Sequence, residues 1–155
     1  MSDMTETRLT VPTEHDMRAL GQRMAADLTA GDLVVLTGDL GAGKTTLVQG
    51  IAAGLGARGP VLSPTFVIAR IYRGGRVPLV HVDAYRLGSR VEVDDLDLDA
   101  DLAESVTVVE WGDGLVDGLT PDRIVVSIRR SSDETDETRH VDVTTVGDRQ
   151  PVLGR

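Results

Sequence analysis

Several residue types and patterns are missing from this 155-residue chain. It has no cysteine, which excludes disulfide bonds and thiolate metal sites. It has only one Phe, one Trp and two Tyr, so a platform for stacking nucleobases is not expected. No apolar run approaches the ~20 residues that cross a bilayer, and no apolar segment follows a basic one at the start. We therefore expect a cytoplasmic protein that does not associate with membranes.

Positive charge is also scarce. The chain has 16 Lys and Arg residues against 25 Asp and Glu, which gives a net charge of -9 at pH 7. Proteins that hold nucleic acid directly draw most of their affinity from basic side chains on phosphates. Any nucleic-acid role is therefore expected to be indirect. The length suits one domain, which we place at residues 1–146, followed by a flexible tail at 147–155.

Helix and strand patterns alternate along the chain. Thr13 and Asp16 resemble a capping box, and apolar residues then recur at helical spacing until Gly31. A second helix is expected over 44–55, with Gly56 as its stop. Gly74 and Gly75 predict the turn of a β-hairpin. Strands are expected over residues 7–12, 32–38, 66–73, 77–83, 106–110, 123–130 and 139–146.

Two segments have a polar or acidic character. Residues 92–104 carry seven carboxylates around apolar residues at helical spacing. This pattern predicts a solvated amphipathic helix, with an acidic docking surface as the alternative. Residues 131–137, "SSDETDE", are expected to form a polar hairpin loop.

The single lysine of the chain, Lys44, lies in "GDLGAGKTTL" at residues 38–47. This stretch fits the phosphate-loop pattern G-x-x-x-x-G-K-[ST] and lies between a buried strand and a helix, as that loop requires. Glycines let backbone amides converge on phosphate oxygens, and a compact ammonium can reach over the loop where a planar guanidinium cannot. Thr45 offers a hydroxyl to Mg²⁺.

Carboxylates at strand ends are candidates for holding the metal and ordering the attacking water. Glu110 follows "VTVV" and Asp83 follows "LVHV". His81 is interpreted as a hydrogen-bonded structural residue, with a catalytic base as the alternative. Tyr85 and Arg86 come soon after Asp83, and their spacing does not separate a core position from a partner contact.

Some motifs of nucleotide-binding proteins are missing. The chain has no N-K-x-D motif for guanine and no L-S-G-G-Q motif of transporter ATPases. Few residues remain for an acceptor domain or an arginine-rich lid, although a small-molecule kinase stays possible. Adenine nucleotide is therefore the expected ligand.

Four motifs together resemble one family. They are "GDLGAGKTTL", "SPTF" at 63–66, "HVDAYRL" at 81–87 and "VVEWGD" at 108–113. Their order and spacing resemble the bacterial TsaE family, also called YjeE, over residues 13 to 146. The resemblance implies an α/β fold, specifically a three-layer P-loop NTPase-like fold with a mixed parallel and antiparallel central sheet.

The resemblance also implies a function. Members are small ATPases that work with TsaB and TsaD to make threonylcarbamoyladenosine in tRNA. By this resemblance the transfer chemistry belongs to TsaD, and ATP hydrolysis on TsaE resets the complex between turnovers. The implied ligands are ATP or ADP with Mg²⁺, and tRNA would be contacted through the other subunits.

The family's functional residues can be placed on this sequence. Lys44 would contact the β and γ phosphates, Thr45 and Glu110 would hold Mg²⁺, and Asp83 would orient the hydrolytic water. Trp111 would pack beside the site, while Thr13 and Arg139 would approach the base or ribose. Ser63 and Thr65 would lie in a nucleotide-sensing switch, with a plain turn as the alternative. The phosphate loop would comprise Gly38, Asp39, Leu40, Gly41, Ala42, Gly43, Lys44, Thr45 and Thr46.

Two other functions stay open on the sequence. A small-molecule kinase would use the same phosphate loop to transfer phosphate to a metabolite. A nucleotide-binding scaffold would bind ATP without turning it over.

Overall fold

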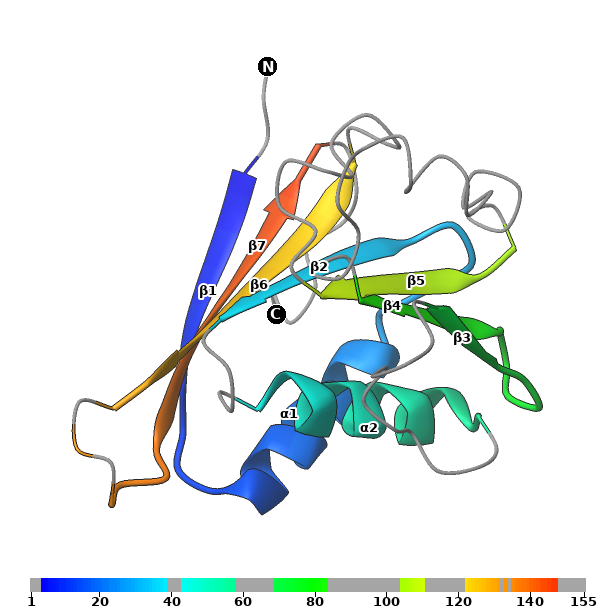
Figure 1. Cartoon of the computed structure of the whole chain (residues 1–155). Coiled ribbons are helices and arrows are strands. Elements are labelled where there is room, and N and C mark those ends of the chain that lie inside the picture. Colours follow the sequence, from blue (N-terminus) through cyan, green and yellow to red (C-terminus); the bar gives the residue numbers. More distant parts are fainter. Residues whose placement is uncertain are drawn as a thin grey trace.

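The computed structural model in Figure 1 shows one mixed sheet with two helices packed against one of its faces. The structure describes residues 4–38, 43–57, 69–83, 104–110, 122–131, 133 and 135–147. The helices in this part of the chain are α1 (Glu14–Ala25) and α2 (Lys44–Leu55). The strands are β1 (Met4–Val11), β2 (Leu33–Gly38), β3 (Ala69–Tyr72), β4 (Leu79–Asp83), β5 (Val106–Glu110), β6 (Arg123–Arg130) and β7 (Arg139–Val146).

The sheet has the strand order β1-β7-β6-β2-β5-β4-β3. Its centre is parallel, since β2 pairs in parallel with β5 and β6, and β4 pairs in parallel with β5. The outer pairs β1–β7, β6–β7 and β3–β4 are antiparallel. The predicted α/β fold with a mixed sheet is confirmed. Because β2 lies between β5 and β6, the loop that follows it begins in the middle of the sheet's carboxyl edge.

The central strands are buried on both faces. Val34 and Leu36 face the helices and belong to the core that α1 and α2 complete, and both are fully buried. Leu33 and Val35 face the other way and are buried too. This explains the uninterrupted apolar run of β2, which is typical of a strand covered on two sides. Both described helices lie on one face, so the predicted third layer, including the expected helix at 92–104, falls outside the described residues apart from Glu104.

The start of α1 follows the predicted capping box. The Thr13 hydroxyl oxygen accepts a hydrogen bond from the Asp16 amide at 3.1 Å, and the hydroxyl donates to the Asp16 carboxylate at 2.8 Å. This satisfies one of the amide groups that a helix leaves unpaired at its start. The cap fixes the point at which β1 turns into α1.

The end of α1 differs from the prediction. The apolar spacing continued to Leu28, but the helix ends at Ala25. Leu28 is still fully buried, although it lies beyond the helix. Arg76, from the β3–β4 hairpin, donates to the carbonyl oxygens of Ala25 at 2.7 Å and Leu28 at 3.0 Å. A tertiary partner thus satisfies carbonyl groups at this end of the helix, which periodicity cannot reveal.

The first strand is longer than predicted. It begins at Met4 rather than residue 7, because its whole length pairs with β7 from Met4↔Val146 to Val11↔Arg139. The β3–β4 hairpin is confirmed, with Gly74 at φ 95° in its turn. None of the helices in the described part of the chain is long and apolar enough to cross a membrane.

The two helices approach each other backbone to backbone. A side chain at Gly50 of α2 would collide with the Arg18 carbonyl oxygen of α1. A Cβ atom at Gly21 would lie only 2.7 Å from the Ile51 amide nitrogen. Contacts advance in the same direction along both helices, from Gly21 beside Ile51 to Ala25 beside Gly54. The first turns of α1 and α2 therefore lie at the same end of the pair.

Candidate nucleotide site

The phosphate-loop lysine is the first residue of α2. Lys44 is buried, and its ammonium nitrogen donates to the Gly38 carbonyl oxygen at 2.8 Å. The side chain therefore folds back across the loop toward the end of β2. Residues 39–42 between these two points lie outside the described residues. The position of Lys44, at the start of the helix that follows the loop, is the one from which a phosphate-loop lysine reaches bound phosphates.

The glycines at the two ends of the loop have conformations that other residues avoid. Gly43 has φ 109°, in the left-handed region, and a Cβ atom there would lie 3.3 Å from the Met17 methyl carbon. Gly38 has φ 152°, and its Cβ would lie 2.6 Å from the Ile128 carbonyl oxygen. The N-cap residue of α2 is Gly43, which has no side chain to cap the helix. An anion could therefore accept from the first amide groups of α2, as in a phosphate loop.

The two predicted carboxylates end neighbouring parallel strands. Asp83 and Glu110 are register partners in the β4–β5 ladder, and Glu110 also pairs with Leu36 of β2. Glu110 is buried, with 5% of its surface exposed. The structure describes only the backbone of Asp83. Both residues therefore lie at the edge of the sheet from which the phosphate loop leaves.

His81 is hydrogen-bonded, and its partner is the predicted metal ligand. The His81 Nε2 atom lies 2.6 Å from the Glu110 Oε2 atom, and His81 is fully buried. The interpretation of His81 as a hydrogen-bonded residue is thus confirmed, but the sequence analysis did not name Glu110 as the partner. The contact depends on the β4–β5 register, which pairs His81 with Val108, two residues before Glu110, and no motif in the sequence marks that register.

The donor set fits magnesium. In the part of the chain that the structure describes, no group of three or more His, Cys, Asp or Glu residues could hold a metal. Mg²⁺ is usually bound by one or two carboxylates together with substrate phosphates and water, rather than by an all-protein cage. Thr45, half-buried in the first turn of α2, and Glu110 could supply oxygen ligands of that type.

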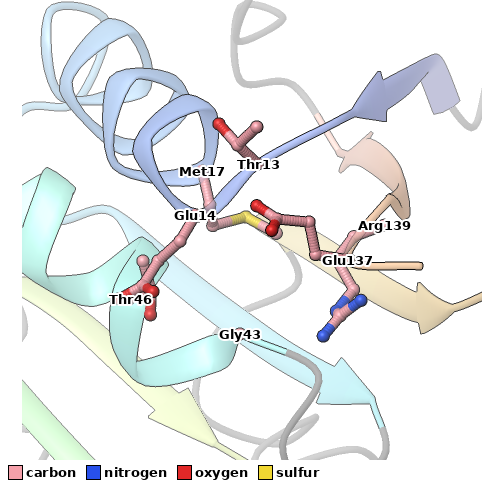
Figure 2. Close-up of a pocket in the computed structure, with 7 residues that line it drawn as sticks. All are labelled: Thr13, Glu14, Met17, Gly43, Thr46, Glu137 and Arg139. Carbon is pink, nitrogen blue, oxygen red and sulfur yellow. The ribbon is translucent and has the colours of Figure 1, made fainter. Parts of the chain in front are cut away.

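A pocket of about 280 Å³ opens beside the phosphate loop. Figure 2 shows side chains from the first turns of both helices and from the β6–β7 connection around it. The lining residues are Thr13, Glu14, Met17, Gly43, Thr46, Glu137 and Arg139. The structure thus brings together Thr13, Thr46 and Arg139, which the sequence analysis placed at a nucleotide site. Gly43 belongs both to this wall and to the phosphate loop.

Three of the lining residues were not predicted. Met17 has the spacing of a core residue, and Glu14 has that of an acidic residue in the first turn of a helix. Glu137 lies at the end of the predicted polar loop. No motif marks these residues, because the fold alone brings α1 and the β6–β7 connection together.

Hydrogen-bonded turns order the chain that leads to Glu137 and Arg139. The Asp133 carboxylate accepts from the Thr135 hydroxyl at 2.7 Å and from its amide at 2.9 Å, and these bonds hold the Asp133 pKa below its ordinary value. The Thr138 amide likewise donates to Asp136 at 2.9 Å and lowers the Asp136 pKa. Both turns lie within a few residues of Glu137 and Arg139, which line the pocket.

Several predicted residues fall outside the described part of the chain. They are Asp39, Leu40, Gly41, Ala42, Ser63, Thr65, Tyr85, Arg86 and Trp111. Their proposed roles in the phosphate loop, in a switch or in partner contacts remain predictions.

Comparison with known proteins connects this geometry to a family. A family model described as "Threonylcarbamoyl adenosine biosynthesis protein TsaE" matches residues 11–141. The chain belongs to the TsaE family. The matched range runs from the end of β1 to the third residue of β7, so it includes every described residue of the phosphate loop, the pocket and the His81–Glu110 pair.

Relatives in the TsaE family resemble most of the chain. The tRNA threonylcarbamoyladenosine biosynthesis protein TsaE of Streptomyces coelicolor is 59% identical over 137 residues, which cover 86% of this chain and 93% of that protein. The Bacillus subtilis protein of the same name is 39% identical over 139 residues, which cover 89% of this chain and 85% of that protein. The crystal structure of Bacillus subtilis YdiB superposes with a TM-score of 0.74 at 33% identity, over 96% of this chain and 90% of that one.

Proposed function

We propose that this TsaE-family protein binds and hydrolyses ATP with Mg²⁺, and that it does so with TsaB and TsaD in tRNA threonylcarbamoyladenosine biosynthesis. The observation that carries the proposal is the arrangement of Lys44 and Glu110, both buried, around the end of β2. Family membership supports the pathway, and the site supports the chemistry.

The phosphates of ATP would bind between Lys44 and the start of α2. The Lys44 ammonium, which here lies on the Gly38 carbonyl, would neutralise negative charge on the β and γ phosphates. The N-cap residue Gly43 has no side chain, and the amide groups at the start of α2 would donate to phosphate oxygens. Charge that develops during hydrolysis would thus be stabilised by groups that are already in place.

The carboxyl edge of the sheet would provide the metal site and the hydrolytic water site. Bound Mg²⁺ would supply positive charge at the triphosphate, and the Thr45 hydroxyl and Glu110 carboxylate would hold it. Asp83 ends the neighbouring strand, next to Glu110 in the ladder, and would orient the attacking water.

The pocket would receive the adenine and ribose. It shares Gly43 with the phosphate loop, so one ligand can occupy both. The Met17 thioether would pack against the flat base, and carboxylates such as Glu137 accept hydrogen bonds of the kind that an exocyclic amino group donates. In Figure 2, Arg139 extends from β7 toward the Gly43 side of the pocket, where the ribose and phosphates would lie.

The acidic composition of the chain supports a role in which its partners, rather than this protein, bind the tRNA. With a net charge of -9, the protein is poorly suited to bind tRNA by itself. TsaB and TsaD would therefore contact the tRNA, and this chain would contribute ATP turnover to the complex.

Phosphate release from ATP tests the proposal. We expect slow hydrolysis by the purified protein with MgCl₂ and faster hydrolysis when purified TsaB and TsaD are both added. A rate that the partners leave unchanged would contradict the partner-dependent function. Transfer of the phosphate to a metabolite rather than to water would favour the kinase.

Arg139 provides a test of the pocket. The variant Arg139→Ala is expected to weaken binding of a fluorescent AMPPNP derivative about tenfold, because one charge-assisted contact is lost. The matched control is Arg130→Ala, since Arg130 pairs with Arg139 in the β6–β7 ladder but does not line the pocket. Fluorescence titration should show little change in the control. Equal losses in both variants would point to general surface charge and contradict a pocket contact.

A further inference from the structure

The contact between His81 and Glu110 lies in an apolar part of the core. His81 is fully buried, and its Nε2 atom lies 2.6 Å from Glu110 Oε2. Two neighbours of His81 are fully buried as well. Leu79 lies two residues earlier on the same face of β4, and Val108 is the register partner of His81 on β5. The histidine is therefore a polar group in an environment where an apolar side chain would pack at least as well.

The contact uses only one of the two ring nitrogens. The Nδ1 atom of His81 is buried and has no hydrogen-bond partner, and it is the single such side-chain atom among the described residues. A buried polar atom without a partner costs about 1 to 3 kcal/mol. Packing against the apolar neighbours therefore gives no reason for a histidine at this position. Its specific contribution is the contact that Nε2 makes with the buried Glu110 carboxylate.

The contact constrains Glu110. With Glu110 as a carboxylate, Oε2 can only accept, so in that state Nε2 is the donor of the contact. The contact at Oε2 restricts the orientation of the Glu110 side chain and leaves Oε1 as the oxygen that could bind another ligand. Hydrogen bonds that orient a metal-binding side chain are worth roughly 10- to 100-fold in metal affinity.

We propose that His81 is a positioning residue that holds the Glu110 carboxylate in the orientation needed to bind the magnesium of the nucleotide. The inference rests on the proposed function, in which Glu110 binds Mg²⁺. His81 acts through Glu110 and touches neither the nucleotide nor the metal. It thereby links the core of β4 to the carboxyl edge of the sheet.

The test uses two variants that differ in where they place an amide group. Gln reaches approximately the position of Nε2 and can still donate to Glu110, whereas Asn reaches only the position of Nδ1. MgCl₂ is titrated into the full-length protein with a fluorescent AMPPNP derivative, and affinity in EDTA is measured separately. His81→Asn is expected to raise the half-saturating Mg²⁺ concentration about tenfold and to leave the affinity in EDTA within about twofold. His81→Gln is expected to stay near the wild-type value.

A double-mutant cycle shows whether His81 acts through Glu110. In a Glu110→Gln background, His81→Asn should cause no further change in the half-saturating concentration. The proposal is overturned if His81→Asn keeps the wild-type value, if His81→Gln fails as badly as His81→Asn, or if the two changes are additive. The variant Leu79→Ala controls for lost stability, because it opens the same face of β4 and should leave the Mg²⁺ dependence unchanged. Absence of Mg²⁺-dependent binding in the wild type would instead contradict the proposed function.

Discussion

The variant Lys44→Ala is expected to weaken ATP binding on the order of 100-fold, because truncating one partner of a buried charge contact costs roughly 3 kcal/mol. The fold should survive, since alanine is the most favourable helix residue and Lys44 is the first residue of α2. Calorimetry with AMPPNP and MgCl₂ measures the affinity, and circular dichroism checks the fold. In cells depleted of the wild-type protein, the variant should fail to restore threonylcarbamoyladenosine in tRNA.

Lys44→Arg separates charge from shape in the same experiment. Arginine keeps the positive charge, but its planar guanidinium is wider than an ammonium and would have to fit the buried position beside the Gly38 carbonyl. We expect most of the affinity to be lost in this variant too. Near wild-type binding by Lys44→Ala would remove the basis for a phosphate site in this loop.

The variant Glu110→Gln is expected to slow ATP hydrolysis about 100-fold or more while it leaves nucleotide affinity in EDTA nearly unchanged. The amide keeps the size of the side chain and an oxygen that can accept from His81, but it loses the negative charge that would face the metal. Single-turnover phosphate release with TsaB and TsaD present measures the chemical step. Binding of AMPPNP in EDTA provides the reference for affinity.

Asp83→Asn is the companion variant, because Asp83 pairs with Glu110 at the end of the next strand. A loss of hydrolysis without a loss of Mg²⁺ dependence would assign Asp83 to the water and Glu110 to the metal. If Glu110→Gln hydrolysed ATP at the wild-type rate, Glu110 would have no part in the chemistry. If it supported full tRNA modification without hydrolysis, the nucleotide-binding scaffold would be favoured.

Much of the fold was predictable because its signals are local. The bounds of α2 follow from the lysine after the phosphate-loop glycines and from Gly56, which adopts φ 80° at the end of the helix. The predicted bounds of β5, β6 and β7 match those observed. The predicted boundary was wrong where a residue distant in the sequence contacts the end of an element. Arg76, for example, binds carbonyl oxygens at the end of α1.

The site was predictable where chemistry requires a fixed spacing. The phosphate loop needs its residues adjacent in the chain, and the carboxylates need only to end strands, so both leave a pattern in the sequence. Glu14 and Glu137 reach the pocket from segments far apart in the chain, and nothing in the residues around them indicates that meeting. The His81–Glu110 contact lies between these cases, since it depends on a strand register that the sequence does not state.

The glycine-mediated contact between α1 and α2 gives the site a mechanical property. Gly50 packs directly against the Arg18 carbonyl, so no side chains separate the two helices at this point. Side-chain rearrangement there cannot accommodate a movement of one helix against the other. The wall that would face the base comes largely from α1, and the lysine on the phosphates comes from α2. Both ends of a bound nucleotide would thus be held by two helices that cannot readily shift against each other. A conformational signal of the proposed ATP turnover would then have to travel through other parts of the molecule.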